Sequence, residues 1–262
     1  AYTPQDLANK EVIVGDRPYA SLLFFTFGNT SYHIRKNFIL QSDIMLGSMG
    51  TSGPGNAQAY IHRHHWLGST RPIPRGWDNQ IGFNGAFIIN YNTRLQGRLF
   101  KTNESYSNVK WFQSNWVAKA DLGNYMINLQ GGIKLNLINY NSGILQDFNP
   151  DLPSIRKVNT AAIIPKKSFR FNLFLEPHVR IAAYNATLEG LMFNDHSIYK
   201  IDHSEVKRLL FELNTGVNCL IGYFLYLRYS FYGRSREFTG GKPFHSWGGI
   251  TVGASPAKWN HS

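Results

Sequence analysis

The stretch Leu-Tyr-Leu-Arg-Tyr-Ser-Phe-Tyr, residues 225–232, is the best guide to the fold of this chain. Its odd-numbered positions carry large apolar side chains, and its even-numbered positions carry Tyr, Arg, Ser and Tyr. Successive side chains of a β-strand point to opposite faces of the sheet, so the stretch predicts a strand with one apolar face. Residues 169–176 and 125–130 alternate in the same way. The pattern fits a membrane barrel with a polar lumen, and also a soluble sheet with its apolar face inside.

Strand-like segments recur along the whole chain and several are long. Globular sandwiches usually have strands of about 5–6 residues, so longer strands separated by short turns favour a barrel. We therefore predict an all-β fold, an antiparallel transmembrane β-barrel of about 10–12 strands. Nothing resembles a linker, so residues 1–262 are expected to form one domain, with loops at 100–107 and 146–168. The predicted strands lie near residues 20–29, 33–47, 81–93, 111–121, 124–139, 168–183, 186–194, 206–220, 222–234 and 245–254.

Composition narrows the class of protein. Charged residues make up 16% of the chain, against about 25% in a typical soluble domain, and aromatic residues make up 15%. The net charge of +11 is spread singly along apolar runs, so a nucleic-acid binder, with its dense basic stripe, is not expected. Anionic lipid and unspecific surface charge both remain open as explanations. A lone Cys219 excludes an internal disulfide, and no run reaches the roughly 18 apolar residues of a membrane helix.

The N-terminal sequence Ala-Tyr-Thr-Pro has neither the basic start nor the apolar stretch of a signal peptide. An exported protein would have lost that peptide. The N-terminus is therefore compatible with a mature, exported chain.

The segment 49–80 interrupts the strand rhythm. A glycine-rich turn is followed by Asn56–Leu67, which predicts a short helix capped by Asn56 or Ser52. On that helix Gln58 and His62 lie four residues apart and share a face. His62 and His65 have the spacing of a possible metal chelate, but no acidic residue on the helix accompanies them. From spacing alone, His62 is best interpreted as a surface histidine hydrogen-bonded to a neighbour.

Four short motifs, taken in order, carry a more specific signal. Together they resemble the outer-membrane lipid A 3-O-deacylase family, and residues 184–190, Tyr-Asn-Ala-Thr-Leu-Glu-Gly, also resemble a segment of that family. The strand layout extends the resemblance along nearly the whole chain. The motifs are Asp16-Arg17-Pro18-Tyr19-Ala20, Gly50-Thr51-Ser52-Gly53-Pro54, Gln58-x-x-x-His62-Arg63 and Pro74-Arg75-Gly76-Trp77-Asp78-Asn79-Gln80.

The resemblance implies a function and a place. It implies a twelve-stranded barrel in the bacterial outer membrane, with the active site at the outer-leaflet end between the wall and an extracellular helix. Such enzymes hydrolyse the 3-O-linked acyl chains of lipid A and require calcium, so lipid A or lipopolysaccharide is the expected partner. The family's catalytic histidine corresponds to His62, whose neutral imidazole would take a proton from water. The basic charge suits a substrate that carries phosphates.

Supporting roles are expected for other residues of the motifs. Gln58 would orient the helix or the imidazole of His62. Asp16 and Arg17 are predicted to form a salt bridge that fixes a loop. Tyr19 and Trp77 are expected either at the membrane interface or against the substrate. Gln80 ends the last motif and is included as a supporting residue.

The chain departs from the family pattern in two places. The family's opening Asn-Asp strand and its Tyr-Thr-x-Gly strand have no counterpart here. Either the family's N-terminal strands are missing from this sequence, or this protein closes its barrel differently. The run after Gln80, residues 81–85, lacks the family's carboxylate. Asp16, Asp78 and Glu189 remain as acidic candidates, and no metal ligand is assigned among them. The alternatives are a non-catalytic barrel of the same fold and a soluble β-sandwich.

Overall fold

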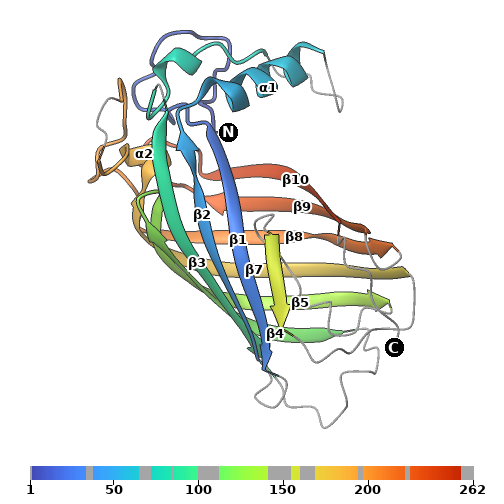
Figure 1. Cartoon of the computed structure of the whole chain (residues 1–262). Helices are drawn as coiled ribbons and strands as arrows, with labels where there is room; N and C mark the ends of the chain where they lie inside the picture. The colour runs from blue at the N-terminus through green and yellow to red at the C-terminus, as the bar shows by residue number, and fades with distance from the viewer. Residues whose placement is uncertain are drawn as a thin grey trace.

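A computed structural model describes residues 2–33, 38–64, 72–83, 85–99, 112–140, 155–159, 169–193, 197–221 and 225–254. Ten strands form one curled sheet in the order β10-β9-β8-β7-β5-β4-β3-β2-β1-β6 (Figure 1). None of the described helices has the length and apolar character of a membrane-spanning helix. The strands are β1 (Leu22–His33), β2 (Phe38–Met49), β3 (Ala86–Arg98), β4 (Gln113–Gly123), β5 (Met126–Tyr140), β6 (Ile155–Asn159), β7 (Phe169–Asn185), β8 (Leu209–Ile221), β9 (Leu225–Ser235) and β10 (Phe244–Ala254).

Seven of the predicted strands are confirmed within a few residues, and two more, 33–47 and 81–93, begin five residues late, at Phe38 and Ala86. The predicted strand at 186–194 is wrong, because α2 (Ala186–Glu189) begins there. Asn185 ends β7 and its side chain accepts a hydrogen bond from the backbone N–H of Thr187, which starts a helix instead of a turn between strands. The predicted loop 146–168 contains β6, which pairs with β1 in parallel, whereas every other pair is antiparallel. Five residues are too few for alternation to distinguish this strand from a loop.

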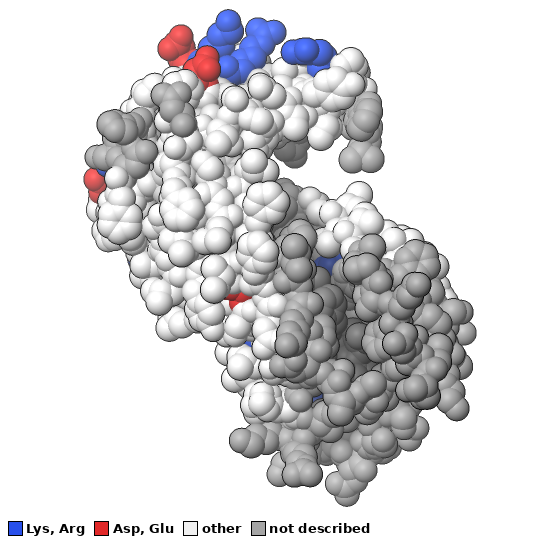
Figure 2. Space-filling view, viewed as in Figure 1, with Lys and Arg blue, Asp and Glu red and all other residues white. Residues whose placement is uncertain are grey.

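The two faces of the sheet decide between the membrane and the soluble interpretation. Phe25 is 68% exposed on the outer face of β1, whereas Glu176 on the inner face of β7 is fully buried. A soluble barrel would place its apolar face inside, so this arrangement indicates an outer surface in contact with lipid and a polar lumen. The outer wall visible in Figure 2 carries few charged side chains, and Lys and Arg gather at the tip of one end beside Asp and Glu. The inward-facing buried polar residues include Gln41, Asn90, Arg94, Asn115, Lys134, Asn172, His178, Glu212, Asn214, Arg228 and Arg234.

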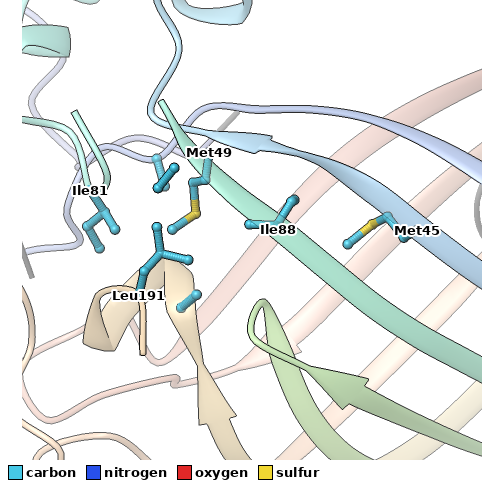
Figure 3. Close-up of a cluster of buried hydrophobic side chains, with 8 residues drawn as sticks. Met45, Met49, Ile81, Ile88 and Leu191 are labelled. Atoms are coloured by element: carbon cyan, nitrogen blue, oxygen red, sulfur yellow. The ribbon is translucent and has the colours of Figure 1, made fainter. Parts of the chain in front are cut away.

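The end of the barrel where Lys and Arg gather carries what we call the cap: residues 2–21, 50–64 and 72–83, together with α2. The cap includes α1 (Ser52–Arg63) and the short 3-10 helix η3 (Trp77–Asn79). Figure 1 shows α1 and the N-terminal residues at this end of the barrel. A buried apolar cluster joins the cap to β2 and β3, and Figure 3 shows Met49, Ile81 and Leu191 converging in it. The cluster fixes the cap motifs relative to the barrel wall.

Helix α1 begins four residues earlier than the sequence predicts. Its N-cap is Thr51, in extended conformation and without a side-chain cap, so neither Asn56 nor Ser52 serves that role. Pro54 lies in the first turn, where a backbone N–H has no intrahelical partner, so the proline is tolerated there. The helical residues end at Arg63, and residues 65–67 of the predicted helix lie outside the described residues.

Candidate active site

His62 lies on the face of α1 that packs against the rest of the cap. Its side chain is 9% exposed, and its Nδ1 atom lies 2.8 Å from the carbonyl oxygen of Pro72. A carbonyl oxygen only accepts hydrogen bonds, so Nδ1 must carry the proton that is donated to it. In the neutral imidazole the lone pair is then on Nε2. The interpretation of His62 as a surface histidine is therefore wrong, and the hydrogen bond presents Nε2 as a proton acceptor.

Three polar atoms around this face of α1 are buried and have no hydrogen-bond partner among the described residues. They are Gln58 Oε1, Thr51 Oγ1 and Trp77 Nε1. Gln58 therefore does not orient His62 through its amide oxygen. A buried polar atom without a partner costs about 1–3 kcal/mol, so such atoms are expected where water or a ligand binds. Gln58 lies one turn before His62, whereas Thr51 and Trp77 lie at the start of α1, where the Trp77 ring contacts Gly55. The unsatisfied atoms are therefore distributed along α1.

Close contacts between aromatic rings and glycines position α1. The rings of Tyr19 and Trp77 meet edge to face, with centroids 4.8 Å apart. A Cβ atom at Gly55 of α1 would lie 2.7 Å from the Trp77 ring, and one at Gly76 would lie 2.5 Å from the Tyr19 ring. Both positions therefore require glycine. Tyr19 is buried, and its hydroxyl donates to the carbonyl of Leu7 at 3.3 Å, so its expected place at the lipid interface is wrong.

Ser21 connects two further motifs. Its Oγ atom lies 2.6 Å from the carbonyl oxygen of Thr51 and 2.6 Å from Oε1 of Gln80. Ser21 and Gln80 are both buried, so this small network holds the start of α1 against the end of the last motif. The sequence prediction missed Ser21, although it directly follows the Asp-Arg-Pro-Tyr-Ala motif.

The predicted salt bridge between Asp16 and Arg17 is wrong. The Asp16 carboxylate accepts hydrogen bonds from the backbone N–H groups of Gln5 and Arg17, at 2.8 and 2.7 Å. The Arg17 guanidinium instead pairs with Glu237 and donates to Thr187 Oγ1 at 2.7 Å. Burial alone would raise the pKa of the Glu237 carboxyl, but Arg17 and Arg234 lower it below its usual range. The buried acid attracts the guanidinium, while backbone donors satisfy Asp16.

Comparison with known proteins settles the family. Residues 1–255 match the family described as "Outer membrane protein LpxR". The chain belongs to the LpxR family. A solved structure, "LpxR from Salmonella typhimurium", matches with a TM-score of 0.70 at 17% sequence identity. The match covers 96% of this chain and 79% of that one, and no curated protein sequence matches.

LpxR-family membership confirms the predicted place and fold. The protein is an outer membrane protein with the β-barrel fold of that family. The twelve strands implied by the resemblance are not all present in the described residues, where the sheet has ten strands. The four motifs come together in the cap, as a single site requires.

The described residues of this LpxR-family protein do not fit a calcium site. Ca²⁺ binds 6–8 oxygen ligands, usually with several carboxylates. Gln58 and Thr51 provide unsatisfied neutral oxygens, but no group of three His, Cys, Asp or Glu residues occurs in the described part of the chain. The three acidic candidates do not form a set of metal ligands. Asp16 accepts hydrogen bonds from backbone N–H groups, Asp78 is exposed on η3, and Glu189 forms an ion pair with Arg208 at 2.8 Å.

Residues missed by the sequence prediction include Glu237, Thr187 and Thr51. Thr51 could have been predicted, because it belongs to the Gly-Thr-Ser-Gly-Pro motif. Glu237 lies 220 residues from Arg17, and no local pattern connects the two. Thr187 lies two residues after Asn185 in the segment 184–190, and its spacing predicted no role for it.

Proposed function

We propose that this protein removes 3-O-linked acyl chains from lipid A in the outer membrane, with His62 as the general base. The hydrogen bond from Nδ1 to the Pro72 carbonyl carries this proposal, because it leaves the Nε2 lone pair for a proton. Membership of the LpxR family and the resemblance of the motifs supply the substrate class.

The reaction balances as a simple ester hydrolysis. Nε2 of His62 takes a proton from water while the water oxygen attacks the ester carbonyl carbon. The bond from that carbon to the sugar oxygen then breaks, and the imidazolium returns its proton to the leaving oxygen. The products are a fatty acid and a free 3-hydroxyl group. A positioned general base of this kind contributes a factor of about 10²–10⁴ to the rate.

Basic side chains of the cap could bind such a substrate. The exposed basic residues in the described part of the cap are Lys10, Arg63 and Arg75, and the exposed acidic residues there are Asp6, Glu11 and Asp78. Lys and Arg at the tip of this end, visible in Figure 2, would attract the phosphates of lipopolysaccharide. The same distribution gives no support to a nucleic-acid partner, which stays excluded as a prediction.

The alternative function is a non-catalytic barrel that keeps the fold. The observation that favours it is the lack of a carboxylate cluster among the described residues near α1. A calcium requirement accordingly remains a prediction from the resemblance, and no step above depends on a metal.

The test is to express the wild type and His62→Ala in cells that lack their own deacylase and to weigh their lipid A by mass spectrometry. We expect the wild type to release one acyl chain per lipid A and His62→Ala to release almost none. If both proteins reach the outer membrane and both leave lipid A intact, the non-catalytic alternative holds. If both remove the chain, His62 is not the base.

A further inference from the structure

A second unsatisfied site lies inside the barrel, near the end opposite the cap. Arg228 of β9, Phe174 of β7 and Lys134 of β5 meet there, and Arg228 is only 2% exposed. The Arg228 Cζ atom lies 4.6 Å from the centroid of the Phe174 ring, and the Lys134 Nζ atom lies 5.9 Å from it. The ring supports the Arg228 guanidinium, and this contact offsets only part of the cost of its desolvation.

The Arg228 guanidinium is held in one orientation but is not neutralised. Its Nε atom donates to Ser230 Oγ at 2.6 Å, and the Phe174 ring supports its face. Its Nη1 and Nη2 atoms are buried and have no hydrogen-bond acceptor among the described residues. A buried charge without a partner is strongly destabilising, so native proteins pair such a group or place an ion beside it.

The neighbouring carboxylate is already engaged. Glu176 accepts two hydrogen bonds from Arg94, at 3.0 and 2.8 Å, and forms an ion pair with Lys119 at 2.9 Å. Glu176 also lies near Lys134, and it makes no hydrogen bond to the Nη atoms of Arg228. The neighbouring carboxylate therefore does not neutralise the Arg228 guanidinium.

A chain of amides adds another unsatisfied donor. The hydroxyl of Tyr226 donates to Asn218, Asn218 donates to Asn172, and Asn172 donates to Asn136, at 2.8, 3.0 and 3.2 Å. The chain ends at Asn136 Nδ2, which has no acceptor in the described part of the structure. Asn136 is the cross-strand neighbour of Phe174. The unsatisfied atoms on Arg228 and Asn136 are thus all donors.

We propose that this part of the lumen binds a small inorganic oxyanion of the phosphate class, with Arg228 as its principal ligand. A guanidinium presents parallel N–H donors that match two oxygens of a phosphate or sulfate. Water would accept a hydrogen bond but would leave the charge unbalanced. The Nη atoms are buried, so the ligand is a free ion and not the phosphate of a lipid headgroup. The site is separate from the proposed hydrolysis at His62.

The test is thermal unfolding of the full chain in detergent micelles during titration with inorganic phosphate. Ionic strength is held constant with gluconate, a larger and singly charged anion, as the background salt. We expect a saturable rise in Tm for the wild type and for Lys242→Met, which removes an exposed cation elsewhere. Arg228→Met should abolish the rise, and Arg228→Lys should weaken the apparent affinity at least 10-fold.

A second measurement distinguishes loss of phosphate binding from misfolding of the variant. Without phosphate, Arg228→Met should be at least as stable as the wild type, because it removes an unpaired buried charge. If Arg228→Met does not fold, Asn136→Ala takes its place and should weaken the apparent affinity several-fold. The proposal is overturned if phosphate leaves the wild-type Tm unchanged, or if the variants show the wild-type rise. A full rise in the presence of lipopolysaccharide alone would assign the site to a lipid phosphate instead.

Discussion

Nδ1 of His62 lies 2.8 Å from the carbonyl oxygen of Pro72, so a backbone carbonyl 10 residues further along the chain determines the tautomer of the imidazole. The acceptor is a main-chain oxygen, which side-chain substitution cannot remove. The chain has thereby fixed a proton on one nitrogen and left the other as a base. Nδ1 of His62 therefore has a structural role, and Nε2 has the proposed chemical role.

The first prediction uses this difference between the two nitrogens. In His62→Asn the amide nitrogen occupies the place of Nδ1 and can still donate to Pro72, but nothing replaces Nε2. We expect unfolding free energy within about 1 kcal/mol of the wild type and a rate of lipid A deacylation at least about 100-fold lower. Urea unfolding in micelles and mass spectrometry of lipid A measure the two. His62→Gln, which loses the Pro72 contact, is the control. If His62→Asn keeps wild-type activity, the proposed base is wrong.

The second prediction concerns the glycine beneath Trp77. A Cβ atom at Gly55 would lie 2.7 Å from the indole, whereas one at Gly53, two residues earlier on α1, meets nothing within 4 Å. Gly55→Ala should destabilise the protein by about 1–3 kcal/mol through overpacking. Gly53→Ala should change stability by less than about 1 kcal/mol. Thermal unfolding compares the pair, and equal effects would show that α1 does not depend on the contact with Trp77.

Alternation in the sequence predicted the strands, because the side chains of a strand alternate with a period of two whatever surrounds them. The stretch 225–232 placed Arg228 and Ser230 on one face, and both are buried in the lumen. Which face would meet lipid was not decidable from alternation, since soluble sheets show the same pattern. The exposed outer phenylalanines answered that question.

The site was predictable only as far as its motifs. Gln58 and His62 fall on the predicted helix, but the bond from His62 to Pro72 depends on how the chain returns after α1. Arg17 shows the limit more clearly. Sequence proximity suggested Asp16 as its partner, whereas packing of the cap on the barrel brings Glu237 to it. A long-range partner of this kind leaves no mark on local spacing.

The third prediction tests that correction. Arg17→Met leaves Glu237 buried with one cation fewer and should cost about 3–5 kcal/mol, as does loss of a partner from a buried ion pair. Asp16→Asn keeps one of the two oxygens that accept from the backbone and loses the other bond, so it should cost about 1–2 kcal/mol, less than Arg17→Met. Urea unfolding of both variants in the same micelles gives the comparison. A larger loss in Asp16→Asn than in Arg17→Met would contradict the assigned pairing.

The fourth prediction is a loss of stability in acid. Burial raises the pKa of the Glu189 carboxyl, but Arg208 and neighbouring donors outweigh it, and the pKa of Glu237 is lowered in the same direction. A group whose pKa is lower in the folded state stabilises the protein above the unfolded value, about 4.3 for Glu. That stability falls as the pH drops from there through the folded value. We expect these two carboxyls to contribute no slope to Tm between about pH 7 and 5 and to contribute a decline below about pH 4.3.

Removing a carboxylate from the cap provides the control for the acid series. Glu237→Gln cannot titrate, so its Tm should start lower and fall less between pH 5 and the acid limit of the assay. A variant curve parallel to that of the wild type would show that Glu237 does not contribute to the acid loss. The comparison with the wild type separates its share from that of Glu189.

The fifth prediction concerns calcium, for which the family resemblance and the described donors give different expectations. Neutral oxygens such as Gln58 Oε1 and Thr51 Oγ1 bind Ca²⁺ weakly without carboxylates, because affinity follows the charge of the ligands. If deacylation needs calcium through these atoms alone, a chelator should abolish it and about 0.1–1 mM Ca²⁺ should restore half of the rate. Gln58→Ala should then raise that concentration, whereas Asp78→Asn, on the exposed side of η3, should leave it unchanged. Restoration at micromolar Ca²⁺ would require carboxylate ligands beyond the described residues, and indifference to the chelator would exclude the calcium requirement.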